Sequence, residues 1–103
     1  MVTVYIASPY TLGDPLENVN KSFDVASKLI KLGYAPYCPL YSHYLEMRNP
    51  EKYETWMDLD FEWIKRCDCL LRLPGQSSGA DKEVKFAESI GIPVFYSIEG
   101  LEW

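Results

Sequence analysis

The chain opens with Val2-Thr3-Val4-Tyr5-Ile6-Ala7, and Ser8-Pro9 brings this stretch to an end. β-Branched and aromatic residues bounded by turn-forming residues predict a strand. Shortly afterwards, Asp14-Pro15-Leu16-Glu17 predicts the start of a helix, with Asp14 as N-cap, Pro15 in the first helical position and Glu17 at the capping-box position. A strand followed at once by a helix is the first part of a βαβ crossover, and this decides the fold.

The helix that begins after Asp14 carries apolar residues at helical spacing until Gly33 ends it. We expect its buried stripe to comprise Val19, Phe23, Ala26, Leu29 and Ile30. A short strand is predicted next, over 34–39, and then a loop-like segment over 41–48 whose aromatic residues would also support a helical turn. A helix follows from Asn49-Pro50 to about Arg66. The remaining predicted elements are a strand over 68–73, a polar turn over 74–79, a helix over 80–90, a strand over 92–96 and a short tail over 97–103.

Strands separated by single helices predict right-handed parallel crossovers. The expected fold is therefore a small doubly wound α/β structure, flavodoxin- or Rossmann-like, with an open parallel sheet of about four strands in the order 2-1-3-4 and helices on both faces. Two prolines in the strand over 34–39 favour an edge position. Ligands bind such sheets beyond the carboxyl ends of the strands, where the strand order reverses. We therefore expect the loops over 8–14 and 74–79 to face each other across a crevice.

The composition fits one ordinary globular domain spanning residues 1–103, with 48% hydrophobic and 24% charged residues. No apolar run is long enough for a transmembrane helix, and no signal-peptide pattern opens the chain. Ten basic against fifteen acidic residues give a net charge of −5. This excess of negative charge disfavours a nucleic-acid polymer or an anionic membrane as partner.

Three cysteines, Cys38, Cys67 and Cys69, are an odd number. Without a secretion signal they are expected to be reduced thiols in a cytoplasmic protein. Cys67-Asp68-Cys69 is far in sequence from the single histidine, His43, and a structural zinc site needs four ligands in recognisable pairs. We therefore expect neither a metal site nor a cofactor.

Two carboxylates fall on faces that are otherwise apolar. Asp60 shares a helical stripe with Trp56, Leu59, Trp63, Ile64 and Cys67, whereas Asp58 and Glu62 lie on other faces and are expected to be solvated. Asp60 is therefore either paired with a structural donor or a general acid with a raised pKa. Glu83 borders the apolar stripe of the last helix, near the helix N-terminus, where the macrodipole favours an ionised carboxylate. One acid kept charged beside one pushed toward neutrality would separate a nucleophile from a proton donor.

The turn Gly75-Gln76-Ser77-Ser78-Gly79 precedes a helix, and such helix N-termini bind phosphates or carboxylates. The turn lacks the lysine of a P-loop and the dinucleotide fingerprint, since Asp81 follows Ala80. Gly and Ser are also what any exposed turn uses, so the turn by itself indicates no particular ligand.

Three motifs together resemble the nucleoside 2-deoxyribosyltransferase family, including its 2′-deoxynucleoside 5′-phosphate N-hydrolase branch. They are Tyr5-Ile6-Ala7-Ser8-Pro9-Tyr10, Asp60-x-x-x-Ile64-x-x-x-Asp68 and Ser77-x-Gly79-x-x-x-Glu83. The resemblance extends from the first strand to Val94. It implies cleavage of the N-glycosidic bond of a nucleoside or nucleoside 5′-monophosphate, by hydrolysis or by base exchange.

The resemblance also implies roles for individual residues. Glu83 matches the glutamate that attacks the anomeric carbon and forms a covalent glycosyl intermediate. Asp60 matches the acid that assists departure of the base, and Tyr5 matches a tyrosine near the reacting sugar. The implied substrate-binding residues are Ser8, Pro9, Tyr10, His43, Ser77, Ser78 and Gly79.

Ser77 favours the phosphate branch, because the transferases typically have an aspartate there and a hydroxyl can donate to phosphate where a carboxylate would repel it. Two features depart from the family pattern. The segment 8–13 has no basic residue, which leaves phosphate to backbone N–H groups, the serines and Lys82. The chain also ends at Trp103, before the segment with which relatives complete a neighbouring subunit's site.

A retaining mechanism would place the two carboxyl groups roughly 5 Å apart. Tyr10, Tyr41, Tyr44 and Trp56 are candidates to sandwich the base, although ordinary packing explains aromatic residues equally well. The rival interpretation is a non-catalytic nucleotide-binding or interaction domain on the same sheet. We expect a homodimer or higher homo-oligomer, because 15% aromatic residues is much for a small domain to cover.

Overall fold

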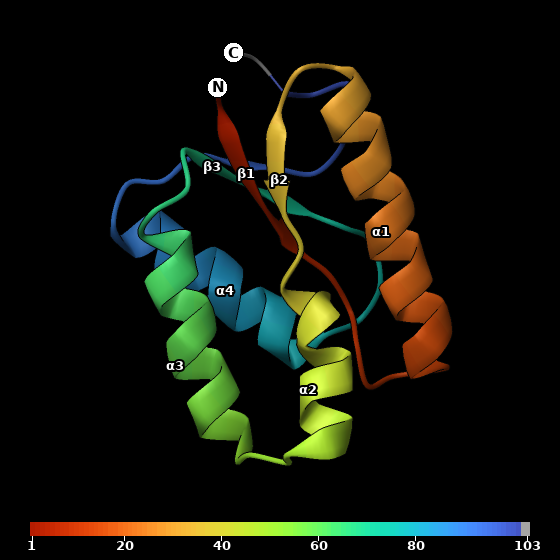
Figure 1. Cartoon of the computed structure of the whole chain (residues 1–103). Helices are drawn as coiled ribbons and strands as arrows, with labels where there is room; N and C mark the ends of the chain where they lie inside the picture. Colours follow the sequence, from red (N-terminus) through yellow and green to blue (C-terminus); the bar gives the residue numbers. More distant parts are fainter. Residues whose placement is uncertain (102–103) are drawn as a thin grey trace.

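A computed structural model describes residues 1–101; the last two residues of the predicted tail over 97–103 lie outside the described part. Four strands form one parallel sheet in the order β2-β1-β3-β4, as predicted (Figure 1). The strands are β1 (Thr3–Ala7), β2 (Ala35–Tyr37), β3 (Cys69–Arg72) and β4 (Val94–Phe95). The strand order reverses between β1 and β3, which pair directly in parallel.

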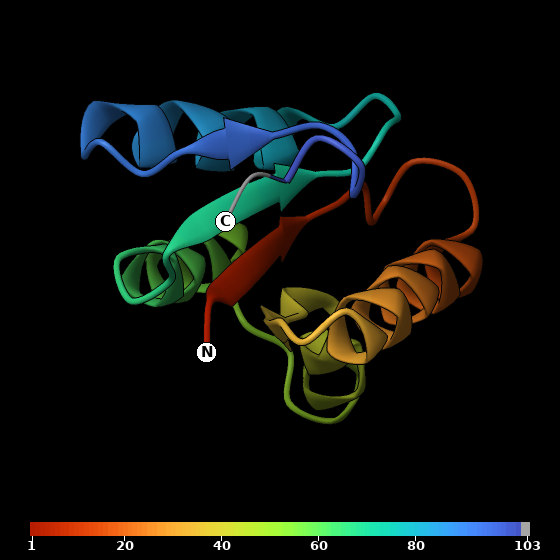
Figure 2. The same ribbon diagram turned by 90° about the horizontal axis from the view of Figure 1, so that it is seen from above.

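Helices cover both faces of the sheet (Figure 2). Helix α1 (Pro15–Lys31) packs on one face, whereas α3 (Tyr53–Ile64) and α4 (Ser78–Ser89) pack on the other. Because successive residues of a strand point to opposite faces, each strand contributes to two cores. Val4 and Ile6 of β1 join Leu29 of α1, and Tyr5 and Ala7 join the residues of α3 and α4. Both central strands are therefore buried on both sides, as the near-continuous apolar runs of parallel strands require.

Side-chain caps begin two of the helices. The Asp14 carboxylate accepts a 3.0 Å hydrogen bond from the Leu16 N–H, as expected for the start of α1. The Ser77 hydroxyl oxygen accepts a 3.0 Å bond from the Ala80 N–H, so α4 begins at Ser78, two residues before the predicted start.

The predicted inward stripe of α1 is partly wrong. Phe23 and Ile30 are exposed, by 37% and 62%, whereas Val19, Ser22 and Leu29 are buried. Ser22 is tolerated there because its hydroxyl donates to the Val19 carbonyl at 2.7 Å and accepts from the Cys38 thiol at 3.0 Å. A buried polar group with partners costs little, so the helix can turn this residue inward.

The segment after β2 is helical, which corrects the loop expected over 41–48. A short 3₁₀ helix, η1 (Pro39–Ser42), leads directly into α2 (His43–Arg48). The helix expected to begin at Asn49-Pro50 begins only at Tyr53, because Asn49 instead ends α2, its N–H donating to the Leu45 carbonyl at 2.8 Å. In the part of the chain that the structure describes, no helix has the length and apolarity to cross a membrane.

Candidate active site

A cavity of about 530 Å³ opens beyond the carboxyl ends of the strands, within the range of about 300–1,000 Å³ usual for small-molecule sites. The loops over 8–14 and 74–79 both line it, so they face each other as predicted. They also touch: a Cβ built on Gly75, whose φ is +118°, would lie 2.9 Å from Pro9 Cγ. Residues of η1, α2 and α3 complete the walls.

Three titratable side chains meet at the inner end of this cavity. Tyr5 is fully buried in β1, and its hydroxyl donates a short hydrogen bond to Glu83 Oε2. Glu83, on α4, is only 5% exposed. Asp60, on α3, lies within hydrogen-bonding reach of both Tyr5 and Glu83. Asp60 and Glu83 line the cavity, whereas Tyr5 lies behind Glu83 and does not.

Burial raises the pKa of both carboxyls. Loss of solvent is the largest cause of the raised pKa of Glu83, followed by the charge of Asp60; the Tyr5 hydroxyl and the more distant Arg72 oppose it. Burial also raises the pKa of Asp60, to about 6, against the hydrogen bonds from Glu83 and Tyr5. Two neighbouring carboxyls with raised pKa values share a proton near neutral pH. Burial raises the pKa of Tyr5 well above 10, so Tyr5 remains a neutral donor.

The pKa of Asp60 is raised, as the general-acid interpretation requires, whereas the raised pKa of Glu83 differs from the expectation. The sequence predicted a charged Glu83, stabilised by the α4 dipole, and a neutral Asp60. In the structure, loss of solvent outweighs the dipole at Glu83, which is more deeply buried than Asp60.

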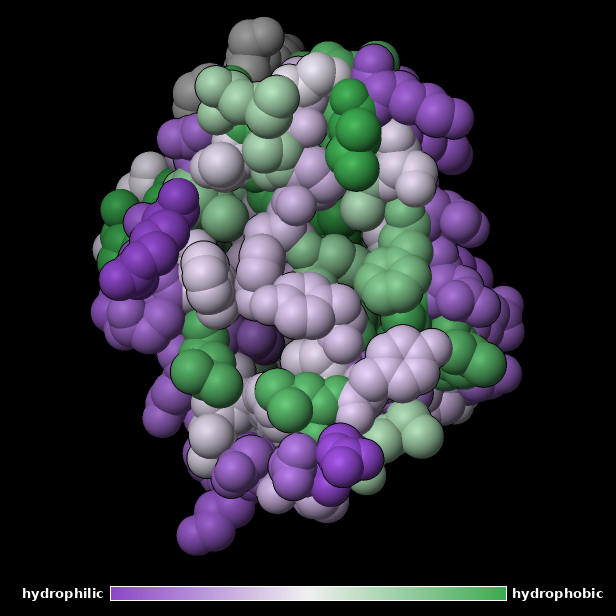
Figure 3. Space-filling view, viewed as in Figure 1, coloured by the Kyte–Doolittle hydropathy of each residue, from purple (hydrophilic) through white to green (hydrophobic). Residues whose placement is uncertain are grey.

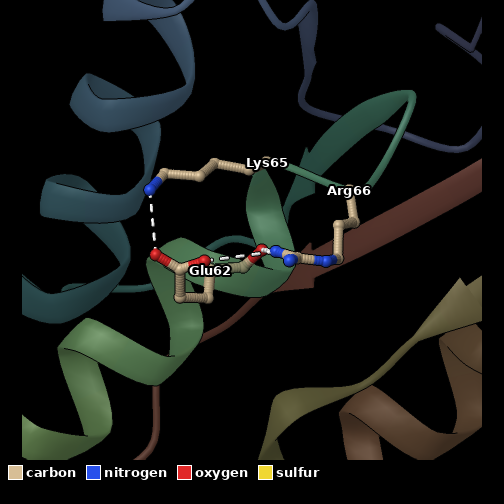
Figure 4. Close-up of polar contacts among 3 residues, drawn as sticks. All are labelled: Glu62, Lys65 and Arg66. Carbon is tan, nitrogen blue, oxygen red and sulfur yellow. Dashed lines mark hydrogen bonds and ion pairs between the residues drawn. The ribbon is translucent and has the colours of Figure 1, made fainter.

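The carboxylate on the solvent-facing side of α3, Glu62, has an environment unlike that of Asp60. It lies two residues from Asp60 but faces solvent, where it pairs with Lys65 at 2.9 Å and Arg66 at 3.2 Å (Figure 4). Those two cations lower the pKa of Glu62. Asp58 is exposed as well, so both carboxylates expected to be solvated are solvated.

Most of the expected substrate-binding residues surround the cavity. Six of the seven line it: Ser8, Tyr10, His43, Ser77, Ser78 and Gly79. Pro9 does not line the cavity; from the loop over 8–14 it contacts Gly75 of the loop over 74–79. The Ser77 hydroxyl is engaged as the cap of α4.

Aromatic side chains contribute unequally to the walls. Tyr10 and Trp56 line the cavity, but Tyr41 and Tyr44 do not and are exposed by more than half. The Tyr10 hydroxyl forms a short hydrogen bond with Nδ1 of His43. This bond joins the loop after β1 to the start of α2.

Sequence reasoning missed the contribution of α2. Glu46 lines the cavity, and its Oε2 accepts a short hydrogen bond from Trp56 Nε1 and a 3.0 Å bond from the Glu51 N–H. Met57, Tyr53 and Gln76 are further lining residues that were not predicted. The one available signal was the spacing of His43 and Glu46, which share a helix face if the segment is helical.

Basic residues lie near the cavity but not in its walls. Arg72, at the end of β3, donates to the Leu73 carbonyl, to the Gly75 carbonyl at 3.0 Å and to Asp81 at 2.9 Å. Its guanidinium therefore holds the loop over 73–75 in place. Lys82 lies 5.1 Å over the Tyr53 ring. Among residues 1–101, no Lys or Arg lines the cavity, whereas four carboxylates do: Glu46, Glu51, Asp60 and Glu83.

The fold is that of 2-deoxyribosyltransferases. The 2-deoxyribosyltransferase of Bacillus psychrosaccharolyticus is 26% identical, with a TM-score of 0.62 over 90% of this chain and 69% of the other. The enzyme of Leishmania mexicana described as a 2-desoxiribosyltransferase is 18% identical and has the same fold, with a TM-score of 0.67 over 91% of this chain and 62% of the other.

The chain itself belongs to the protein family described as a domain of unknown function, DUF7768, whose model matches residues 2–97. No curated protein matches the sequence.

Proposed function

We propose that this protein cleaves the N-glycosidic bond of a nucleoside, with Glu83 as nucleophile and Asp60 as general acid. One observation carries the proposal: Tyr5, Glu83 and Asp60 meet at the inner end of a cavity that lies where the strand order reverses. The similarity to the Bacillus psychrosaccharolyticus 2-deoxyribosyltransferase supports the choice of reaction. A buried carboxylate pair with raised pKa values is costly, which is typical of a catalytic site.

The first step needs an ionised nucleophile and a protonated acid. Both are present at once when the shared proton lies on Asp60 and Glu83 is ionised. A Glu83 carboxylate oxygen then bonds to C1′ while the bond from C1′ to the base nitrogen breaks, and the electron pair leaves with the base. Asp60 gives its proton to that base, which departs neutral.

The second step releases the sugar. Asp60, now ionised, takes a proton from water or from an incoming base. The oxygen or nitrogen of that acceptor bonds to C1′ as the bond to Glu83 breaks. The two displacements together retain the configuration at C1′. The Tyr5 hydroxyl keeps its hydrogen bond to Glu83 and fixes the orientation of the carboxylate throughout.

An uncharged nucleoside fits this cavity better than a nucleoside 5′-monophosphate. The Ser77 hydroxyl oxygen accepts the capping bond of α4, and its proton can still be donated, so Ser77 does not decide between the two substrates. In the described chain, four carboxylates and no Lys or Arg surround the cavity. A phosphate dianion would bring further negative charge to a cavity whose described walls contain no Lys or Arg.

We also propose a homodimer. Large apolar side chains gather on η1 and α2 beside the cavity, with exposures above half: Tyr41, Tyr44, Leu45 and Met47. Figure 3 shows this face, where hydrophilic side chains lie along the flanks and apolar or weakly polar ones cover the middle. Light scattering is expected to give twice the chain mass, and a monomer would contradict this part alone.

The direct test is incubation of purified protein with 2′-deoxynucleosides, ribonucleosides and their 5′-monophosphates, with free base followed by chromatography. We expect base release from 2′-deoxynucleosides, and faster exchange when a second base is added if the protein is a transferase. Nucleoside binding without any released base would instead support the non-catalytic alternative.

A further inference from the structure

The carboxylate of Glu46 is held in the cavity wall with one oxygen occupied. Its Oε2 accepts hydrogen bonds from Trp56 Nε1 and from the Glu51 N–H, donors on two different segments. Of the residues that the structure describes, none donates a hydrogen bond to Oε1. Glu46 therefore has a fixed orientation and an acceptor left over in a site that a ligand enters.

The bond between Glu46 and Trp56 also fixes the indole. Trp56 lines the cavity and precedes Asp60 by four residues on α3, so the two lie one above the other, about 6 Å apart along the helix. An aromatic side chain with a fixed rotamer is a stacking surface for a heterocycle. A base stacked on Trp56 would thus lie one helical turn from Asp60, the acid proposed to protonate it.

Tyr10 and His43 occupy the same end of the cavity. The charge of Glu46 contributes to the raised pKa of Tyr10, so Glu46 lies near this pair. The Tyr10 hydroxyl and His43 Nδ1 share a hydrogen bond in which either group can be the donor. The imidazole and the phenol can each donate or accept a hydrogen bond, whereas the Glu46 carboxylate is an acceptor. This end of the cavity can thus match the mixed donors and acceptors of a heterocycle, which the carboxylate pair at the other end does not.

We infer that Glu46 determines which bases the site accepts, by receiving a hydrogen bond from an N–H on the edge of the heterocycle away from the sugar, while Trp56 stacks on the ring. This rests on the proposed function, whose residues it does not share. The substrate class is a nucleoside whose base carries such a donor, for example an exocyclic amino group. A base without a donor leaves the carboxylate desolvated and unpaired, which is the main source of rejection by polar sites.

The test compares substrates that differ only in the donor. One pair is 2′-deoxyadenosine and purine 2′-deoxyriboside, which lacks only the amino group; the other is 2′-deoxycytidine and its analogue without the amino group. The ratio of kcat/KM within each pair is measured for the native protein and for Glu46→Ala. Differences in the intrinsic lability of the glycosidic bond cancel when the two ratios are divided.

We expect the ratio to favour the donor-bearing substrate at least about tenfold more in the native protein than in Glu46→Ala. Glu46→Gln keeps a carbonyl acceptor and should keep the native preference within about threefold. Glu54→Gln removes the same charge from the exposed first turn of α3 and is the matched control, with an unchanged ratio. Glu46→Leu, of similar size, replaces Glu46→Ala if circular dichroism shows that the alanine variant is unfolded.

One kinetic result would overturn the inference. If Glu46→Ala lowers kcat/KM by the same factor for both members of a pair, the ratio is unchanged, and Glu46 supports Trp56 without reading the base edge. Should no nucleoside be cleaved at all, the proposed function fails, and calorimetry with free adenine and purine replaces kinetics. A tenfold preference for adenine that Glu46→Ala abolishes then supports the inference; equal or absent binding overturns it.

Discussion

The same strands contribute residues to both faces of the sheet, but the two faces differ in what they bury. Toward α1, Val4 and Ile6 of β1 meet Leu29 and other apolar residues, with a serine and a cysteine that bond to each other nearby. Toward α3 and α4, the alternate residue Tyr5 carries its hydroxyl to a buried glutamate. The comparison teaches that the α1 face provides stability, whereas the α3–α4 face buries titratable groups at a cost in stability.

The largest expected effect is that of Glu83→Gln on the α3–α4 face, which should abolish activity without lowering stability. Glu83→Gln should lower base release by at least about 10³-fold, because the amide cannot act as the nucleophile. Its thermal midpoint should equal or exceed that of the native protein, since an uncharged group is buried more cheaply. Chromatography of the base and a circular dichroism melt measure the two quantities.

Glu88→Gln, an exposed substitution on the same helix, is the control and should change neither quantity. More than a tenth of native activity in Glu83→Gln would remove Glu83 from its proposed role.

The next effect belongs to the opposite face. Leu29→Ala should cost about 2–5 kcal/mol of unfolding free energy, the usual range for a fully buried leucine. The kcat of the folded fraction should remain native, because Leu29 touches none of the three titratable groups. Urea unfolding and activity below the midpoint check both, with exposed Ile30→Ala as the matched variant. A large loss of kcat here would mean that the two faces are coupled.

A smaller effect is expected from Tyr5→Phe. Loss of a hydrogen bond to a carboxylate should lower kcat about 10–100-fold. Because that bond lowers the pKa of Glu83, its removal raises this pKa further. Less Glu83 is then ionised at a given pH, so the acidic limb of the pH–rate profile should move to higher pH.

Tyr34→Phe, on the α1 face, should leave the profile in place. A Tyr5→Phe profile that keeps its position but drops in height would limit Tyr5 to packing.

The smallest expected effect is a gain in stability from Asp60→Asn. The folded protein raises the pKa of Asp60 from 3.8 to about 6. The folded state therefore binds more protons than the unfolded state between these values, and stability falls as pH rises from about 4 to 6. At pH 8 the substitution should stabilise the protein by about 1–2 kcal/mol, and at pH 4 by almost nothing. Chemical unfolding at both pH values measures this; a destabilised variant at pH 8 would contradict it.

The strand order and the position of the cavity could be predicted from the sequence, because each strand and long helix has its own local signals. Asp60 stood out for a similar reason, as a carboxylate on an apolar stripe. The helix α2 could not be predicted, because His43–Arg48 has no side-chain cap, and Glu46 meets its partners on the following segments through tertiary contacts.

The burial of Glu83 could not be predicted from the sequence either. Ala80 and Ala87 on α4 are small and fully buried, which lets the helix approach the sheet closely. That approach takes Glu83 out of solvent and raises its pKa, against the effect expected from its place near the helix N-terminus. The sequence predicts where a helix begins, and so where its dipole acts, but it does not predict how closely the helix packs on the sheet.

The guanidinium of Arg72, engaged with the loop over 73–75, leaves the cavity walls described here without a cation. Binding of an uncharged substrate releases no counterions, so KM should hardly change between low and high ionic strength. The abundant phosphorylated metabolites of a cell would compete poorly for the same space. If the proposed function holds, the protein would therefore act on a free nucleoside in the presence of an excess of its phosphate esters.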